Sequence, residues 1–256
     1  LNFIKLLVIK AGHSHKGLVP TLQATWASPC ITSPTFPTRP GQLQMPKTCA
    51  SISQGRHKET PRTILLQALA AFALGNEDVK SYEDFLQQRV EINYLAGALL
   101  IDQTSAVKFL KEAKQNRELA VEDLRDTYAV GYETAAHRFT NLATEHLGIP
   151  VHFLKAHSTG ALSKAYENDG VLFPTDALGA VEGQTVCKRW SARQVFGHED
   201  RLTPFHQYTD KPNGTYWCTS RIESGPSGDF SISVGTPFEH VKWFRGRETK
   251  RRGFSS

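Results

Sequence analysis

Residues 131–153 read GYETAAHRFTNLATEHLGIPVHF, and the spacing of their apolar residues changes part-way along. As far as Leu147 the apolar residues recur every three or four positions, which predicts an amphipathic helix. After Pro150 they alternate, which predicts a β-strand. The same letters suit the second helix of a DNA-reading helix-turn-helix, a metallopeptidase fragment or a ligand-sensing core, so the rest of the chain has to decide between them.

Four segments before this stretch also carry helix signals. Gly75 and Asn76 close the first of them, and Ser81 with the acids that follow it opens the second. We therefore expect residues 62–148 to be mostly helical, with helices over 62–74, 81–101, 105–119, 120–130 and 132–147.

Alternation returns in three segments of the second half. The turns KPNG and SGPSGD precede two of them. Strands are therefore expected at 151–157, 215–222 and 229–235. Helices followed by strands favour an α+β fold over a parallel α/β fold.

Three regions differ in composition. Residues 1–60 are rich in proline and contain no acid before Glu59, which is unusual for a soluble domain. This region is interpreted as a basic arm, a poorly ordered leader or a non-native start. A helical domain is expected over 61–149 and a β-rich domain over 150–256.

Composition excludes several classes of protein. Apolar residues make up 39% of the 256, charged residues 21%, and the formal net charge is +5. The sequence has no run of about 18 apolar residues, so it predicts no membrane span. The opening LNFIKLLVI lacks the basic start and cleavage site of a signal peptide. Four widely spaced cysteines do not suggest a disulfide framework. We expect a cytoplasmic protein.

The helix pair over 120–147 has the outline of a helix-turn-helix. Phosphate contact needs cations, yet Glu122, Asp123 and Asp126 make the first helix acidic. The charges favour a helical hairpin packed on a core. If the pair did read DNA, the residues facing the groove would be Tyr132, Glu133, Thr134, His137 and Arg138.

Sequence motifs give no positive case for catalysis. The chain has no His-Glu-x-x-His for a zinc hydrolase, no Gly-x-Gly-x-x-Gly or P-loop for nucleotide phosphates, and no Gly-x-Ser-x-Gly nucleophile elbow. Cys187 and Cys218 stand 31 positions apart without a Cys-x-x-Cys pair, and this spacing alone makes metal binding a minority interpretation.

Cations and aromatics are interleaved through the β-rich half, as in CKRW and KWFRGR. This mixture suits a ligand with phosphates and a flat base, because cations pair with the former and aromatic rings stack on the latter. A nucleotide-containing cofactor and a nucleic acid both fit. A solvated basic surface over an aromatic core explains the pattern equally well.

Three long motifs carry a resemblance to a known family. They are VGYETAAHRFTNLATEHLGIPVHFLKAH, KAYENDGVLFPTDALGAVEGQTVCKRWSARQVF and YWCTSRIESG…SVGTPFEHVKWFRGRET, in this order. Together they closely resemble the short-chain fatty acyl-CoA regulator family, the PrpR/RamB-like transcription regulators of actinobacteria. The resemblance covers roughly residues 81–252.

The resemblance implies a ligand-binding region of a regulator of propionate (methylcitrate) or acetate (glyoxylate) metabolism. Its helical part is expected to look like a degenerate ImmA/IrrE-type peptidase domain. Its β-rich part is expected to sense a short-chain acyl-CoA. DNA is expected to be contacted only through an N-terminal helix-turn-helix that residues 1–60 do not resemble, and a homodimer is left open.

The family resemblance also implies cofactors and site residues. Coenzyme A or a short-chain acyl-CoA is the expected ligand, and Cys187 and Cys218 are the expected metal ligands of a [4Fe-4S] cluster, which usually takes four thiolates. Other hypotheses left open are a direct nucleic-acid-binding module and an acyl-CoA-processing enzyme. The residues expected to bind coenzyme A are Arg138, Lys155, Lys164, Phe173, Arg189, Arg193, Trp243, Phe244 and Arg245.

Overall fold

The computed structural model describes residues 61–75, 81–225 and 228–255. The chain divides into two compact units, Leu1–Leu100 and Ile101–Ser256. The helices that follow Leu100 therefore belong to the same unit as the sheet, whereas the change of period after Pro150 predicted a boundary there. The interpretations of residues 1–60 lie outside the described residues.

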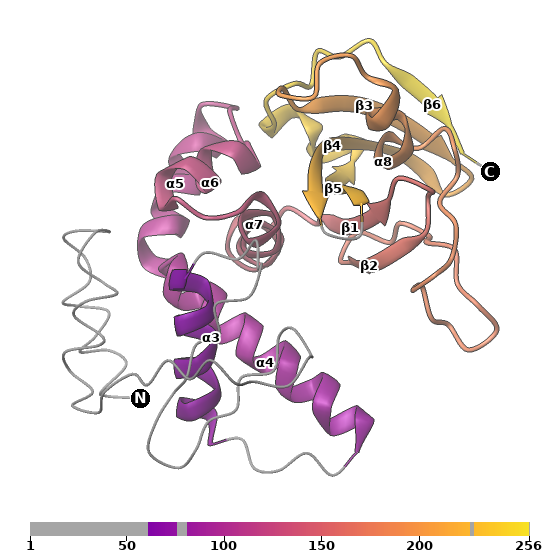
Figure 1. Ribbon diagram of the computed structural model, residues 1–256. Helices are drawn as coiled ribbons and strands as arrows, with labels where there is room; N and C mark the ends of the chain where they lie inside the picture. The colour runs from indigo at the N-terminus through magenta and orange to yellow at the C-terminus, as the bar shows by residue number, and fades with distance from the viewer. Residues whose placement is uncertain (1–60, 76–80, 226–227, 256) are drawn as a thin grey trace. The chain divides into compact units, whose positions relative to one another are not determined.

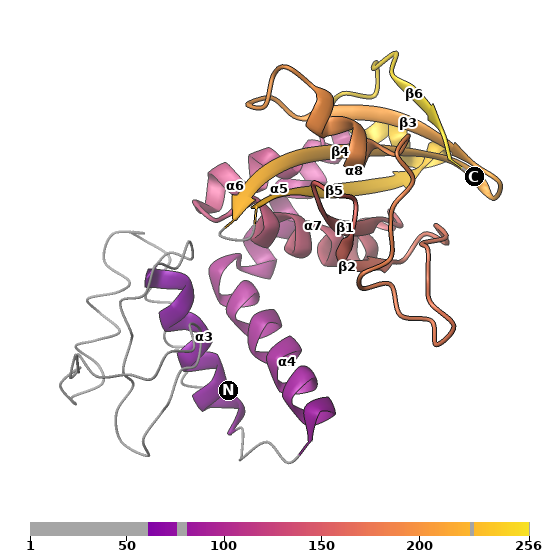
Figure 2. The same ribbon diagram turned by 45° about the vertical axis from the view of Figure 1, so that its right-hand side comes forward.

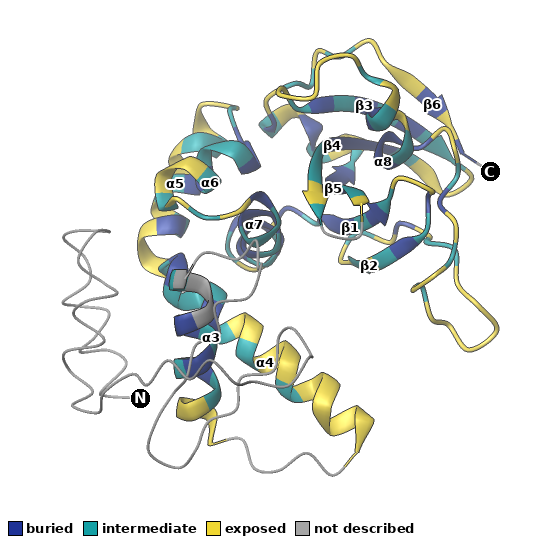
Figure 3. Ribbon diagram, viewed as in Figure 1, coloured by how far each residue is buried: buried dark blue, intermediate teal, exposed yellow. Residues whose placement is uncertain are grey.

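The described part of the first unit is a pair of helices, α3 (Pro61–Leu74) and α4 (Tyr82–Leu100), which lie side by side (Figure 1). The Ser81 hydroxyl caps α4 by accepting a hydrogen bond from the Asp84 amide at 3.0 Å, as its capping pattern predicted. Much of α4 is exposed (Figure 3). Both expected helices are confirmed.

The second unit begins with three helices, α5 (Gln103–Gln115), α6 (Val121–Tyr128) and α7 (Tyr132–Leu147). The Asp102 carboxylate starts α5 by accepting a hydrogen bond from the Ser105 amide at 2.9 Å. Gly148 ends α7 in the left-handed conformation at φ +62°, which glycine adopts without strain. The positions of all three helices agree with the periodicity of the sequence.

Helix α7 is a core element. Its buried residues include Tyr132, Ala135, Ala136, Arg138 and Phe139, and the two alanines let the helix lie close to its neighbours. Two of the residues that a DNA-reading helix would present are thus buried. The prediction of a packed hairpin is confirmed.

A six-stranded sheet forms the rest of the unit, in the order β2-β1-β5-β4-β3-β6. All neighbouring strands are antiparallel except β3 and β6, which are parallel. The three expected strands are confirmed as β1, β4 and β5, while β2, β3 and β6 were not anticipated. The strands are β1 (His152–His157), β2 (Leu162–Glu167), β3 (Phe205–Lys211), β4 (Gly214–Gly225), β5 (Gly228–Pro237) and β6 (Arg252–Phe254).

Consecutive residues of β1 point to opposite faces of the sheet. Phe153 stacks on His137 of α7 with ring centroids 4.0 Å apart, and Leu154 packs in a core cluster with Trp190 and Ala192. Helix α7 therefore covers one face, and the segment with α8 (Ser191–Gln194) and η1 (Val195–Gly197) covers the other (Figure 2). The α+β class is confirmed, and the likeness to an ImmA/IrrE-type domain stays a prediction.

None of the helices within the described ranges combines the length and the apolar character that crossing a membrane requires.

Candidate functional site

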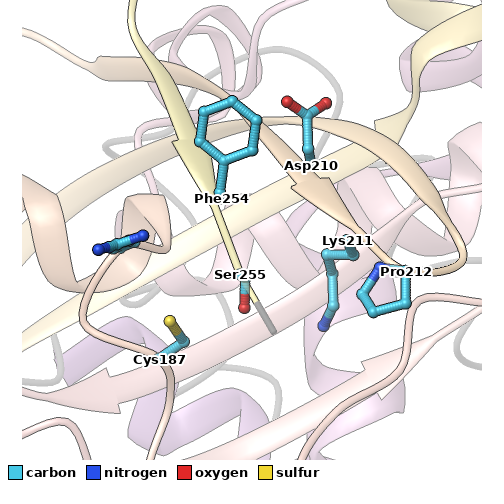
Figure 4. Close-up of a pocket in the computed structure, with 7 residues that line it drawn as sticks. Cys187, Asp210, Lys211, Pro212, Phe254 and Ser255 are labelled. Carbon is cyan, nitrogen blue, oxygen red and sulfur yellow. The ribbon is translucent and has the colours of Figure 1, made fainter.

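A pocket of about 420 Å³ opens at the end of β3 (Figure 4). Figure 4 shows Cys187 and Ser255 beside each other, with Lys211 and Pro212 across from them. Three chain segments meet here, namely the loop before α8, the end of β3 and the end of β6. The lining residues are Cys187, Arg189, Asp210, Lys211, Pro212, Phe254 and Ser255.

Strand β6 can reach this position because Gly253 has no side chain. A Cβ atom there would lie 2.4 Å from the Arg189 carbonyl oxygen and 2.6 Å from the Gln207 amide nitrogen. Gln207 itself donates a hydrogen bond to that carbonyl at 2.8 Å. The loop, β3 and β6 are therefore joined directly at the pocket wall.

The pocket carries an excess of positive charge. Arg252 holds the Asp210 carboxylate with two hydrogen bonds of 2.6 and 2.8 Å, which neutralises the pocket's acid. Arg189 is exposed, and among the described residues it forms no ion pair. With Lys211 it gives the pocket two cations, so the pocket favours an anion.

Lys211 is held in place by its surroundings. Its ammonium donates a hydrogen bond to the Leu172 carbonyl oxygen and lies 4.0 Å from the centre of the Trp190 ring. Burial lowers the pKa of Lys211, and the neighbouring acidic groups Cys218, Cys187 and Asp169 oppose that shift. The side chain is thus an oriented cation beside two thiols.

The Cys187 thiol is half-buried at this pocket. Burial by itself would raise its pKa, but the backbone amide of Arg189, the Ser255 hydroxyl and the charges of Arg189 and Lys211 outweigh burial and lower the pKa of Cys187. Such a cationic setting favours the thiolate form over the thiol.

Behind the pocket three residues form a row across β1, β5 and β4. The strand register pairs Gly235 with His152 on one side and with Cys218 on the other. Because Gly235 has no side chain, His152 Nε2 approaches Cys218 Sγ to 3.5 Å. On its other side, His152 Nδ1 lies 2.6 Å from the Asp169 carboxylate.

This order of thiol, imidazole and carboxylate is that of a cysteine nucleophile with its base. The side chains of His152 and Asp169 have 0% exposure, and Cys218 also has 0%. Burial disfavours protonation of His152, yet Asp169 and Cys218 outweigh it and raise the pKa of His152 to about 9. A substrate has no access to the Cys218 thiol, so we assign Cys218, His152 and Asp169 a structural role.

The donor set for an iron–sulfur cluster is incomplete in the described part of the chain. Its cysteines are Cys187 and Cys218, two of the four thiolates that such a cluster usually takes. No group of three or more His, Cys, Asp and Glu side chains there is arranged to hold a metal ion. The described residues do not by themselves fit the cluster, and cluster binding stays a prediction.

Three of the residues expected to bind coenzyme A lie at or near the pocket. Arg189 lines it, and Phe173 stacks on Trp190 with ring centroids 5.5 Å apart. Arg193 lies against Gly160 and donates a weak 3.4 Å hydrogen bond to the Val186 carbonyl oxygen.

Three more cations lie away from the pocket, on or beside α7. Arg138 is only 5% exposed and donates a hydrogen bond to the Ile101 carbonyl oxygen at 3.3 Å. Lys155 is paired with Glu133 at 2.8 Å. Lys164 Nζ lies 3.3 Å from His137 Nε2.

The last three, Trp243, Phe244 and Arg245, are consecutive residues at the end of η2 (Phe238–Trp243) and directly after it. Lys114 and Lys242 lie 5.3 and 4.9 Å from the Trp243 ring. Phe244 is 2% exposed, and Arg245 is bound by two acids. The nine residues therefore occupy at least three separate places.

Lys211, Phe254 and Ser255 line the pocket but were not singled out from the sequence. Lys211 begins the KPNG turn that the sequence identified, so a cation at a strand end was a signal that could have found it. Phe254 and Ser255 reach the pocket only through the parallel pairing of β6 with β3. No local pattern reveals that pairing.

Comparisons with known proteins place this geometry in context. No protein-family model matches the chain. Two curated proteins named "HTH-type transcriptional regulator RamB", from two strains of Mycobacterium tuberculosis, are 26% identical over 158 residues, which cover 58% of this chain and 31% of theirs. The match thus spans about a third of the curated relatives.

A solved structure described as a Mycobacterium tuberculosis transcriptional regulator matches with a TM-score of 0.72. It is 18% identical, and the match covers 99% of this chain and 83% of that one. At this level of identity the likeness establishes the fold alone.

Proposed function

We propose that this chain is the effector-sensing part of a transcription regulator and that its effector is a short-chain acyl-CoA. The similarity to curated proteins named as transcription regulators supports a regulatory role. The motifs shared with the acyl-CoA regulator family support the choice of effector. By the same resemblance the regulated pathways are those of propionate and acetate, and DNA is contacted by a helix-turn-helix N-terminal to the sensing region.

The observation that carries the proposal is the cationic pocket at the end of β3. Arg189 and Lys211 line it together with the aromatic ring of Phe254, and its acid is neutralised by Arg252. Phosphates of coenzyme A pair with the two cations, and a flat base suits the aromatic wall. A volume of about 420 Å³ takes the phosphate-bearing end of coenzyme A rather than the whole molecule.

Calorimetry with propionyl-CoA tests this assignment. A charge-assisted contact contributes about 1.5–3 kcal/mol, so Arg189→Ala should weaken binding roughly ten- to a hundredfold. Lys188→Ala is the matched control, because Lys188 is the exposed neighbour that does not line the pocket. The affinity of this variant should stay within about fivefold of the wild type, since exposed charges contribute about 0–1 kcal/mol.

The same titration separates a sensor from an enzyme. Propionyl-CoA recovered after incubation should be intact by liquid chromatography, whereas release of free coenzyme A would support an acyl-CoA-processing enzyme. Equal affinities of the Arg189→Ala and Lys188→Ala variants would show that the phosphates bind elsewhere. No binding by the wild type would overturn the proposal for this chain.

A further inference from the structure

A second cavity, of about 180 Å³, lies near the opposite end of β3 and shares no lining residue with the first pocket. Its walls come from the start of α6, from the β3–β4 pair and from the segment around Phe244. That segment is joined to Leu119, two residues before α6, by two backbone hydrogen bonds, from the Leu119 amide to the Trp243 carbonyl oxygen at 2.9 Å and from the Arg245 amide to the Leu119 carbonyl oxygen at 3.0 Å. The cavity is thus a built feature of the second unit.

Three polar atoms of the cavity lining are buried without a hydrogen-bond partner. They are Glu122 Oε1, His206 Nδ1 and Thr219 Oγ1. Thr219 is 3% exposed, and it lies directly opposite His206 in the strand register. Buried polar groups are nearly always paired, so three unpaired atoms around one cavity indicate a polar occupant.

The hydroxyl of Tyr132 adds a fourth unpaired atom next to this group. Tyr132 is 2% exposed, and its hydroxyl lies near Glu122 and Thr219 without a hydrogen bond of normal geometry. Burying these polar groups with partners that are poorly aligned opposes folding. A ligand that pairs with several of them at once relieves that cost.

Glu122 is the one carboxylate among the residues that line the cavity. Arg245 lines it, but Glu118 holds this guanidinium at 2.8 Å and Asp123 at 2.6 and 2.8 Å. Arg221 and Arg125 are near Glu122, yet neither forms an ion pair with it among the described residues. Burial raises the pKa of Glu122, while hydrogen bonding to Tyr132 and the charges of Arg221 and Arg125 oppose that shift. Its Oε1 atom has no hydrogen-bond partner of normal geometry, so a cation bound there would stabilise the carboxylate form.

His206 offers a second acceptor. Burial and the charges of Arg251 and Arg245 outweigh Glu248 and lower the pKa of His206 to about 4. The ring is therefore neutral at pH 7, and a neutral imidazole has one nitrogen that accepts a hydrogen bond. The ring also stacks on Trp217 with centroids 5.3 Å apart, and Trp217 lies 5.1 Å from Phe244.

We propose that this cavity binds a small primary amine. Its ammonium group has three N–H donors, which match the three unpaired atoms of Glu122, His206 and Thr219. Its hydrocarbon part lies against Trp217 and Phe244, whose ring faces also attract cations. A cavity of about 150 Å³ accepts benzene, so this one suits an amine of roughly six to eight non-hydrogen atoms.

Benzylamine is the probe, and benzyl alcohol is its uncharged counterpart of nearly the same shape. Calorimetry on the full chain at pH 7.5 should show benzylamine binding at least tenfold more tightly than the alcohol. Glu122→Gln should lower the affinity for benzylamine at least tenfold, so that the variant binds the two probes with similar affinities. Glu145→Gln removes an exposed carboxylate outside the cavity and should change neither affinity.

Folding of the variant is checked by urea unfolding without ligand. Glu122→Gln should unfold at a urea concentration equal to or above that of the wild type, because the substitution removes an unpaired buried carboxylate. Equal binding of amine and alcohol, unchanged amine affinity in Glu122→Gln, or no binding of either probe would overturn the proposal and leave ordered water as the occupant. These outcomes do not depend on whether the first pocket takes an acyl-CoA.

Discussion

Gly235 shows how a single residue shapes the interior of the second unit. It stands between His152 and Cys218 on the central strands, and its missing side chain is what lets their two polar atoms meet. Strand glycines usually weaken a sheet, and they mark places where other groups approach closely. Here the approaching groups are an imidazole and a thiol.

Gly235→Ala should lower the free energy of unfolding by about 1–3 kcal/mol, the usual cost of overpacking a core. The new Cβ would lie 2.3 Å from His152 Nε2 and 2.8 Å from Cys218 Sγ, and both residues are buried. Urea unfolding followed by tryptophan fluorescence measures the change. Gly197→Ala, where nothing lies within 4 Å of the new atom, should be nearly neutral, and equal effects at both sites would contradict the explanation.

His206 should make the stability of the protein pH-dependent. Its folded pKa of about 4 lies below the ordinary value of 6.5, so the unfolded chain binds the proton more tightly. The free energy of unfolding therefore keeps its full value above about pH 6.5 and decreases as the pH falls towards 4. The decrease is on the order of 2 kcal/mol by pH 5. His206→Gln should flatten this part of the urea-midpoint curve; an unchanged slope would show that other groups cause it.

At the scale of elements, the ends of helices α6 and α7 differ in chemistry. Helix α7 ends at Gly148, whereas α6 ends at Ala129, which has φ +49°. An alanine side chain in the left-handed region is strained, and glycine is not. The turn between the two helices is thus set by the hairpin rather than by local preference.

Ala129→Gly should therefore raise the free energy of unfolding by about 0.5–1 kcal/mol, because relief of the strain exceeds the freedom that glycine gains in the unfolded chain. Ala113→Gly, inside α5, is the same chemical change in ordinary helical backbone and should lower it by about 1 kcal/mol. Urea titrations of both proteins give the comparison. A loss of stability at position 129 would show that the alanine side chain contributes packing there.

At the scale of the whole molecule, the second unit uses helix α7 as core and pairs several of its cations with acids. Helix α7 packs against the sheet, and Arg245, Arg252 and Lys155 each bind carboxylates. A nucleic-acid surface needs free cations on an accessible element. Neither the hairpin nor these three paired cations supply such a surface.

The protein should accordingly bind DNA weakly, with a dissociation constant above about 1 µM at physiological salt, as in non-specific binding. A gel-shift titration measures this, with a sequence-specific DNA-binding protein on the same gel as the positive control. Nanomolar, sequence-specific retention by this chain would support a direct nucleic-acid-binding module instead.

Local periodicity determined much of the fold. Helices α3 to α7, three of the six strands and the α+β class follow from spacing, capping residues and turns, because each depends on residues that are close in sequence. Even the packed character of α7 was readable, since the acids beside it argued against DNA. Strands β2, β3 and β6 were missed because their pairing partners, not their own letters, make them strands.

Only the tertiary structure decided where the chemistry lies. The first pocket joins Cys187, Lys211 and Ser255, and the second joins Glu122, His206 and Thr219, so each set comes from segments far apart in the chain. The residues chosen from composition were scattered because a list of cations carries no information about which of them acids already neutralise. Strand register and ion pairing settle that question, and both arise from contacts between distant residues.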